Sequence, residues 1–461
     1  MRYKSTRGGV SGLSFEEAVM MGLASDGGLL IPEKIPFLNE KDLKHLSELP
    51  YTKLAFEIMN RYQEGIPAHD LMQIIQKSYS RYDTVNMIPV RKAAGMRIAE
   101  LYHGPTYSFK DIALQFLGNL FEYILTKNGQ KLNILGATSG DTGSAAIYGV
   151  KGKQNINIFM LYPANRVSQV QELQMTTTES PNVFCLEIGG NFDNCQDLVK
   201  RTFSDLEFKE EFNLGAVNSI NWARILAQTV YYFWIYFKTV HRVGDEINVV
   251  VPTGNFGNVF AGYIARRMGL PISKLMIATN RNNILTRAVK FGDYSIERVH
   301  PTISPAMDIQ VASNFERYLY YLYGENCEKV VDAMELLRVE KEIDIRGHLL
   351  GQLQRDFIAG EASDEQMKDT IRKVFEQSDY VVDPHTACGI YAANQMEIVA
   401  DNTVCLSTAH PAKFPDVIHE VLGVWPEMPE GLRTLEERQK KSYQIMPELE
   451  DLKTFIASHA K

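Results

Sequence analysis

The fold is decided by one stretch of the sequence, residues 133–150, which reads NILGATSGDTGSAAIYGV. Residues 133–135 form a short apolar strand candidate, a glycine-rich loop follows, and residues 145–150 are typical of a helix. The segment 247–268 has the same order, with the strand 247–251, the loop PTGNFGN and the helix 259–268. Gly269 follows where a helix C-cap belongs. Two strand–loop–helix units of this kind predict an α/β fold.

Further strands and helices alternate around these two units. The predicted strands are 155–161, 183–188, 275–278 and 403–406, and the predicted helices are 193–203, 221–240 and 386–395. Strands alternating with helices of this length imply right-handed crossovers and a parallel sheet that is covered on both faces. Such sheets bind ligands at the carboxyl ends of their strands, where both glycine-rich loops are expected.

The first 90 or so residues are predicted to be rich in helices. Ser14 and Glu17 have the spacing of a capping box, so we expect a helix through Ala24 that Gly27-Gly28 ends. Further helices are predicted at 54–61 and 68–79. The most apolar run, VYYFWIYF at 230–237, is too short to span a bilayer and is interpreted as part of a buried helix. The charged run EERQKK at 436–441 is interpreted as a solvated helix face.

Length and composition limit the class of protein. A chain of 461 residues is too long for one ordinary core, and the predicted division is 1–90, 91–240 and 241–461. A formal charge of −8 argues against a nucleic-acid-binding protein. Five dispersed cysteines without a CxxC pair favour reduced, buried thiols, and neither a signal peptide nor a metal-ligand cluster is recognisable. We therefore expect a cytoplasmic protein without metal, membrane or nucleic-acid partners.

A lysine stands in the segment HGPTYSFKD, residues 103–111. Helix-forming residues follow Lys110, which places it at a loop-to-helix junction. A lysine at a helix start opposes the macrodipole, which lowers the pKa of its amine and favours a nucleophile. Taken alone, the same pattern is also typical of a surface lysine.

The loop at 136–143 is a candidate anion site. Backbone N–H groups at a helix start bind anions, and Thr138, Ser139 and Thr142 add hydroxyl groups. A carboxylate would fit such a loop. An ordinary tight turn is the alternative interpretation of this pattern.

The loop TGNFGN at 253–258 is a second anion candidate. Gly254 and Gly257 allow the backbone to approach a bulky anion closely. The loop lacks the lysine of a P-loop and the three-glycine spacing of a dinucleotide site. A monophosphate is therefore the expected ligand.

A fourth segment, LSTAHPAK at 406–413, follows the predicted strand 403–406. Thr408 lies just past the strand end, where its hydroxyl is able to face a pocket. His410 is interpreted as a structural residue.

Together these segments resemble the beta family of pyridoxal-phosphate enzymes, also called fold type II, and within it the threonine synthases in their longer microbial form. HGPTYSFKD, GATSGDTGSAA, TGNFGN and STAHPAKFPD match in order, as do the opening YKSTRG and ASDGGLLIPEKIP. The resemblance covers nearly the whole chain. It implies two α/β domains that each contain a parallel sheet, an active site between them, and a helix-rich N-terminal domain.

The resemblance also implies which residues hold pyridoxal 5'-phosphate. The lysine of SFKD carries the cofactor as a Schiff base, which assigns this role to Lys110. The cofactor phosphate is assigned to the loop residues Gly254, Asn255, Phe256, Gly257 and Asn258. Many relatives have an asparagine at the position of Asp141 that contacts the ring hydroxyl, so the role of Asp141 is open. The hydroxyl that faces the pyridine nitrogen is assigned to Thr408, with Ser407 as the rival.

Substrate contacts follow from the same resemblance. The SGDTG loop receives the carboxylate of the amino acid, which implies a role for Thr138, Ser139, Gly140 and Thr142. A second phosphate, that of the substrate, is assigned to the following residues: Arg166, Ser168, Asn218, Ser219, Asn221 and Arg224. For either arginine a structural ion pair is the alternative, and Lys413 is a weaker candidate for the same phosphate.

The activity implied is that of a lyase of threonine biosynthesis. It converts O-phospho-L-homoserine and water into L-threonine and phosphate by γ-elimination and β-addition of water. Three alternatives stay open: a lyase of the same fold that releases 2-oxobutanoate, ammonia and phosphate, a serine or threonine dehydratase, and a non-catalytic metabolite-binding relative. The expected partner is the small-molecule substrate, and the expected assembly is a monomer or homodimer.

Overall fold

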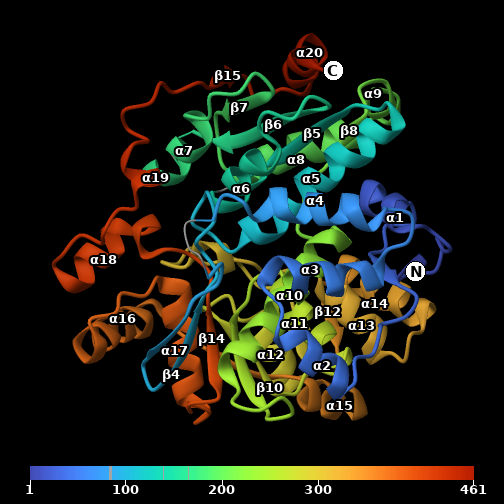
Figure 1. Cartoon of the computed structure of the whole chain (residues 1–461). Helices are drawn as coiled ribbons and strands as arrows, with labels where there is room; N and C mark the ends of the chain where they lie inside the picture. The colour runs from blue at the N-terminus through green and yellow to red at the C-terminus, as the bar shows by residue number, and fades with distance from the viewer. Residues whose placement is uncertain (83–85, 139, 165) are drawn as a thin grey trace. The chain divides into compact units, whose positions relative to one another are not determined.

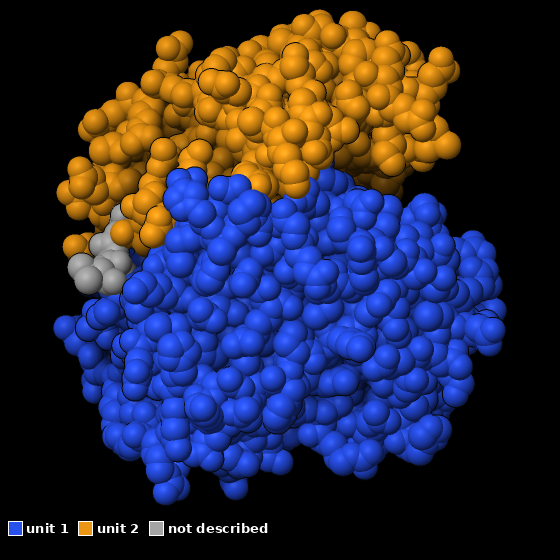
Figure 2. Space-filling view, turned by 45° about the vertical axis from the view of Figure 1, so that its right-hand side comes forward, with its two compact units in different colours: residues 1–75, 84–103, 219–426 blue, residues 76–83, 104–218, 427–461 orange. Residues whose placement is uncertain are grey.

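A computed structural model of the chain describes residues 1–82, 86–138, 140–164 and 166–461. The chain divides into two compact units, which Figure 2 colours separately. Unit 1 comprises residues 1–75, 84–103 and 219–426, and unit 2 comprises residues 76–83, 104–218 and 427–461. Both units are assembled from separate segments of the chain. The three contiguous domains proposed from the sequence stay a prediction.

Unit 2 is built on a five-stranded sheet whose order is β15-β7-β6-β5-β8. The strands are β5 (Leu132–Ala137), β6 (Ile156–Pro163), β7 (Val183–Ile188), β8 (Leu214–Gly215) and β15 (Tyr443–Ile445). Each pairs with its neighbours in parallel, as the alternation of strands and helices predicted. Strand β6 is buried along its whole length, because helices cover both faces of the sheet (Figure 1).

The helices of unit 2 include the two that begin at predicted site residues. They are α5 (Lys110–Asn128), α6 (Asp141–Val150), α7 (Gln169–Thr176), α8 (Phe192–Ser204), α9 (Leu206–Glu211), α19 (Glu430–Arg433) and α20 (Leu449–His459). Helices α5 and α6 cross at two glycines. A Cβ atom on Gly118 would lie 2.0 Å from the carbonyl oxygen of Gly149, so the two backbones are in direct contact. This crossing fixes the start of α5 relative to the start of α6.

The core of unit 2 joins the sheet to the C-terminal helix. Phe159 of β6 and Phe184 of β7 stack with ring centroids 4.9 Å apart, and Phe455 of α20 meets both rings edge-on. Leu452 and Ile456 of α20 are fully buried in the same cluster. The last residues of the chain therefore complete this core.

Unit 1 is built on a six-stranded sheet whose order is β13-β10-β9-β14-β4-β3. The strands are β3 (Val90–Ala93), β4 (Met96–Glu100), β9 (Ile247–Pro252), β10 (Ile272–Thr279), β13 (Ile358–Glu361) and β14 (Thr403–Ser407). All pairings are parallel except that of β3 with β4. The predicted parallel arrangement is confirmed here too, with an antiparallel edge strand added.

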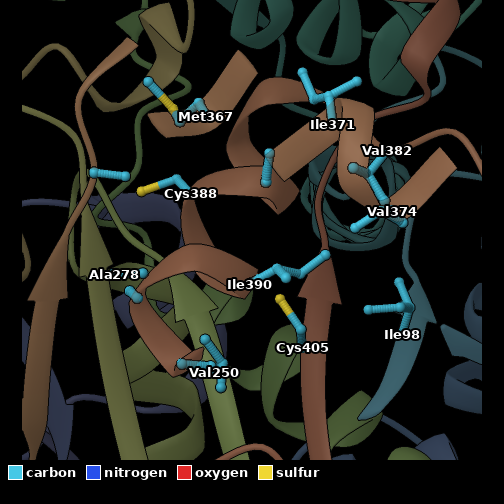
Figure 3. Packing of buried hydrophobic residues seen from close by; sticks show 14 of the residues in the cluster. Ile98, Val250, Ala278, Met367, Ile371, Val374, Val382, Cys388, Ile390 and Cys405 are labelled. Carbon is cyan, nitrogen blue, oxygen red and sulfur yellow. The ribbon is translucent and has the colours of Figure 1, made fainter. Parts of the chain in front are cut away.

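Helices α16 (Asp364–Ser378) and α17 (Pro384–Gln395) supply much of the apolar layer that packs on this sheet. Figure 3 shows Val250 and Cys405 from the sheet beside Cys388 and Ile390 of α17. All five cysteines lie among the described residues and are free thiols, four of them buried. Burial raises the pKa of the Cys185 thiol to about 12, and the four buried cysteines match the expected burial.

The N-terminal part of unit 1 is rich in helices, as predicted. It contains α1 (Phe15–Met21), α2 (Glu40–Ser47), α3 (Tyr51–Met59) and the start of α4 (Ala68–Tyr79), together with the antiparallel pair β1 (Tyr3–Ser5) and β2 (Leu30–Pro32). The capping box of Ser14 and Glu17 is present. The predicted helix end at Ala24 is wrong, because Gly22 takes φ +66° and closes α1 after Met21.

Unit 1 contains further helices along the rest of its length. They are α10 (Trp222–Thr239), α11 (Gly257–Arg267), α12 (Ile284–Phe291), α13 (Phe315–Leu322), α14 (Cys327–Val339), α15 (His348–Asp356) and α18 (Pro415–Leu422), with the small pair β11 (Asp293–Ser295) and β12 (Glu342–Asp344). The apolar run 230–237 lies within α10, of which nearly every residue is buried. Among the described residues, no helix combines the length and the apolar character that crossing a bilayer requires.

The charged run 436–441 is not helical, which corrects the prediction. Helix α19 ends at Arg433, and the run continues as turn and coil. Its side chains are exposed, so the solvated character was predicted correctly. The backbone of Lys441 instead donates to Thr176 O at 2.7 Å, which leads the chain into β15.

Candidate active site

Lys110 is the first residue of α5, at the loop-to-helix junction that the sequence predicted. Its side chain is half-buried. The next residue, Asp111, is fully buried and accepts hydrogen bonds from Thr106 N at 2.8 Å and Thr106 Oγ1 at 2.7 Å. Helix α5 also crosses α6 at Gly118, so the backbone of Lys110 is fixed from two sides.

The loop before α6 is shaped by its own threonine. Thr138 Oγ1 accepts from Gly140 N at 3.0 Å and Gly143 N at 2.9 Å, and it donates to Gly140 O at 3.1 Å. Asp141 Oδ1 accepts from Gln171 Nε2 at 2.9 Å, and Thr142 is half-buried. Ser139, another predicted site residue, lies outside the described residues. Thr138 and Asp141 thus hold the loop, and their predicted ligand contacts stay predictions.

Unit 2 contains three further residues that were predicted to bind the substrate: Arg166, Ser168 and Asn218. Ser168 caps α7 by accepting from Gln171 N at 3.4 Å, so its hydroxyl has a structural partner. Arg166 is exposed and Asn218 is half-buried. Binding roles for these three residues stay predictions.

In unit 1, the loop Thr253–Asn258 lies at the carboxyl end of β9 and the start of the 11-residue helix α11. Within the described residues, none of the backbone N–H groups of Gly254 to Asn258 donates to another residue. The side chain of Asn258 is buried, and its Oδ1 accepts from the hydroxyls of Tyr231 and Tyr232. Its Nδ2 has no hydrogen-bond partner among the described residues.

This loop fits a phosphate monoester. Successive unsatisfied N–H groups at the positive end of a helix dipole bind anions, and the buried amide of Asn258 offers a further donor. A buried donor without an acceptor is costly, so a ligand that accepts from these groups stabilises the loop. The cofactor phosphate predicted from the sequence is such a ligand.

The predicted residues at the entrance to α10 have different environments. Asn221 caps α10 by accepting from Ala223 N at 3.0 Å, and its Nδ2 donates to Val19 O at 2.8 Å. Ser219 Oγ lies 2.8 Å from Ser313 Oγ. Arg224 is 4% exposed, and burial lowers the pKa of its guanidinium to about 10.

Ser219 and Asn255 are brought together by two residues that the sequence analysis missed. Ser313 Oγ donates to Asn255 Oδ1 at 3.2 Å, and Asn314 Nδ2 donates to both Ser219 O and Asn255 O at 3.1 Å. Ser313 and Asn314 lie outside every glycine-rich motif. Their role depends on a contact between distant segments, for which the sequence carries no local signal.

Ser407 and Thr408 differ in how their hydroxyls are used. Thr386 Oγ1 donates to the carboxylate of Asp383 and lies 2.8 Å from Ser407 Oγ. Since the single proton of Thr386 goes to Asp383, Ser407 must donate its own proton to Thr386. Thr408 is 6% exposed and makes no side-chain hydrogen bond to another described residue. Its hydroxyl is therefore the one that stays available.

Comparison with known proteins gives the family. The model "Threonine synthase N terminus" matches residues 2–79, "Pyridoxal-phosphate dependent enzyme" matches 98–409, and "Threonine synthase, C-terminal" matches 386–456. The chain belongs to the threonine synthase family of pyridoxal-phosphate-dependent enzymes. The resemblance stated from the sequence motifs is confirmed.

Individual threonine synthases are similar along the whole chain. That of Schizosaccharomyces pombe is 45% identical over 92% of this chain and 90% of its own length, and that of Pseudomonas aeruginosa is 42% identical over 100% and 98%. The crystal structure of pyridoxal-phosphate-bound threonine synthase from Brucella melitensis has a TM-score of 0.97, with 40% identity and full coverage of both chains. Threonine synthase from yeast has a TM-score of 0.95, with 42% identity over 99% and 98% of the two chains. The predicted fold type II is thereby confirmed.

One buried group near β14 in this threonine synthase family member was missed by the sequence analysis. Asp383 is fully buried and accepts from His385 Nδ1 at 2.8 Å, while His385 Nε2 accepts from Ala306 N at 3.3 Å. Because Nε2 is an acceptor, His385 is neutral and carries its proton on Nδ1. His385 is the second residue of α17, and Asp383 is the residue that caps this helix. A helix-capping pattern was therefore the only signal for this pair that the sequence offered.

Proposed function

We propose that this member of the threonine synthase family converts O-phospho-L-homoserine and water into L-threonine and phosphate, with its cofactor attached to Lys110. The observation that carries the proposal is the similarity to threonine synthases over nearly the whole chain, at 40–45% identity to those of Schizosaccharomyces pombe, Pseudomonas aeruginosa and Brucella melitensis. The open donors of the Gly254–Asn258 loop support it independently, because they suit the phosphate of the cofactor.

The following roles are proposed for the cofactor and for individual residues of the chain. Bound pyridoxal phosphate withdraws electrons from the substrate and so makes protons at Cα and Cβ removable. The amine of Lys110, fixed at the start of α5, removes the proton from Cα and later returns one. The backbone of the loop from Thr138 to Thr142 binds the α-carboxylate at the N-terminus of α6, and Asp141 contacts the cofactor ring.

Thr408 is proposed to face the pyridine nitrogen of the cofactor. Ser407 donates its proton to Thr386, so its oxygen is left only as an acceptor. The hydroxyl of Thr408 keeps its proton for an unprotonated ring nitrogen, and an alcohol cannot protonate that nitrogen fully. This favours the moderate electron withdrawal that elimination and replacement chemistry requires.

Arg224 is the proposed main contact of the substrate phosphate, with Ser219, Asn221, Asn218, Arg166 and Ser168 as further contacts. An arginine binds phosphate with paired hydrogen bonds, and these strengthen away from water. Arg224 is nearly fully buried, whereas Arg166 is exposed. Burial therefore ranks Arg224 ahead of Arg166.

A monomeric or homodimeric state, a cytoplasmic location and the three-domain division also remain proposals.

The decisive experiment is incubation of the purified holoenzyme with O-phospho-L-homoserine while phosphate, threonine, ammonia and 2-oxobutanoate are all measured. We expect threonine and phosphate in equal amounts. Phosphate release accompanied by ammonia and the keto acid would instead establish the lyase. Lys110→Ala is the matched control, and it should abolish both the turnover and the borohydride-trapped covalent attachment of the cofactor.

A further inference from the structure

The loop Gly254–Asn258 is anchored by the residues that lead into α13. Asn314 donates twice to Asn255 O, from its backbone N and from its Nδ2, each at 3.1 Å. In a trans peptide the C=O and N–H groups point in opposite directions. Fixing Asn255 O on Asn314 therefore turns the N–H of Phe256 away from Asn314, where it is free to meet a ligand.

The loop conformation is imposed by its surroundings. Phe256 takes φ +63°, a left-handed conformation that is strained for a bulky residue. Its ring is held edge-on by Phe315, with centroids 5.1 Å apart, and by Phe357, with centroids 5.5 Å apart. A loop under such strain keeps its shape only while its anchors stay in place.

The orientation of the Asn314 amide is decided by Arg317, one turn further along α13. The Nη1 group of Arg317 donates to Asn314 Oδ1. With the oxygen engaged in this way, Nδ2 must point toward Asn255 O and Ser219 O. Arg317 thereby determines which hydrogen bonds Asn314 offers to the loop.

Arg317 is itself held by the N-terminal part of the chain. Its Nε and Nη2 donate to Leu30 O of β2 at 3.1 and 2.9 Å, and Nη2 also donates to Ile220 O. The preceding residue, Glu316, accepts from Arg7 at 2.8 and 3.0 Å and from Thr6 Oγ1 at 2.6 Å. Two consecutive residues of α13 thus attach strand β2 and the two residues that follow β1.

The charge of Arg317 has an unusual environment. Its side chain is fully buried, and within the described residues its hydrogen-bond acceptors are carbonyl oxygens rather than carboxylates. Burial lowers the pKa of the guanidinium to about 9, so it stays charged at neutral pH. The negative charge of the adjacent Glu316 offsets part of the cost of burying this cation, and a phosphate bound at the neighbouring loop would offset more of it.

We propose that Arg317 is the positioning residue of the cofactor-phosphate loop. It acts through Asn314 on Asn255, and Leu30 of strand β2 holds it in place. This gives the first residues of the chain a role in cofactor binding. The inference rests on the proposed function, in which this loop takes the cofactor phosphate.

The test compares two cofactor forms that differ only in the phosphate. Dissociation constants of pyridoxal 5'-phosphate and of pyridoxal are measured on the full-length apoprotein for wild type, Arg317→Lys and Asn314→Asp. Wild type should prefer the phosphorylated form. Each variant should lose about tenfold or more of that preference, as expected when hydrogen bonds to a charged group are disturbed. The affinity for pyridoxal should change little.

Arg287→Met is the matched control, because Arg287 bonds to Asp293 and Ser295 in the same unit and, among the described residues, makes no hydrogen bond to the loop. It should keep the wild-type preference. If Arg317→Lys fails to fold, Asn314→Asp still decides the question. Variants that retain the full preference would overturn the positioning role and leave the proposed function intact. A wild type that binds both forms equally would remove the phosphate role of the loop itself.

Discussion

Replacing Gly118 with alanine has two opposing effects on the stability of the folded protein. In a helix interior alanine is more stable than glycine by about 1 kcal/mol, so propensity alone predicts stabilisation. The added Cβ would lie 2.0 Å from the carbonyl oxygen of Gly149, and real Cβ contacts essentially never fall below 3.0 Å. Helices α5 and α6 must then separate by about 1 Å, and overpacking of this kind typically costs about 1–3 kcal/mol or more. The cost of overpacking should therefore exceed the gain in helix propensity.

The expected result is a net loss of stability on the order of 1–2 kcal/mol in urea unfolding followed by circular dichroism. Activity should fall as well, because Lys110 and Asp141 begin the two helices that are forced apart. Gly351→Ala is the matched control, since Gly351 lies within α15 and its added Cβ would meet nothing within 4 Å. That variant should be slightly stabilised. A Gly118→Ala protein as stable as wild type would refute the close crossing.

Three further predictions concern separate groups. Thr408→Val should shift the visible absorption of the bound cofactor and lower kcat about tenfold or more, whereas Ser407→Ala should leave the spectrum unchanged; equal shifts would reject the assignment. Arg224→Met should raise the KM for O-phospho-L-homoserine about tenfold or more without weakening cofactor binding, and Arg166→Met should do less. Burial, and to a smaller degree the positive charges of nearby arginines, lowers the pKa of Lys151 to about 8, below its ordinary value of 10.5. Because the unfolded chain then holds more protons, the stability of wild type relative to Lys151→Met should rise between about pH 8 and 10.5 in urea titrations, and a flat difference would contradict this.

Much of the architecture was predictable because it depends on neighbours in sequence. The capping box at Ser14, the helix 68–79 and the strands at 183–188 and 247–251 follow from local patterns of polar and apolar residues. Two predictions of helix extent were wrong. Gly22 ended α1 through its left-handed backbone, and the charged run after Arg433 stayed in coil because its chain leads into β15.

The candidate site, like the fold, was predictable where it depends on residues that lie close together in the sequence. Lys110 at the start of α5 and the loops before α6 and α11 follow from glycine, hydroxyl and helix-start signals that lie within a few residues. Their supporting residues could not be found in this way. Asp111 was visible only as part of a motif, and nothing near Ser313 or Asn314 marks them as partners of the cofactor loop.

The sequence by itself determined the alternation of strands and helices, the parallel sheets and the glycine-rich loops at strand ends, because each depends on interactions within a few residues. Only the tertiary structure decided how those loops are held. Arg317 meets Leu30, and Thr386 meets Ser407, through hydrogen bonds that form when folded segments bury polar groups together. A buried donor or acceptor must find a partner wherever the fold supplies one, and distance along the chain gives no indication of which residue that is.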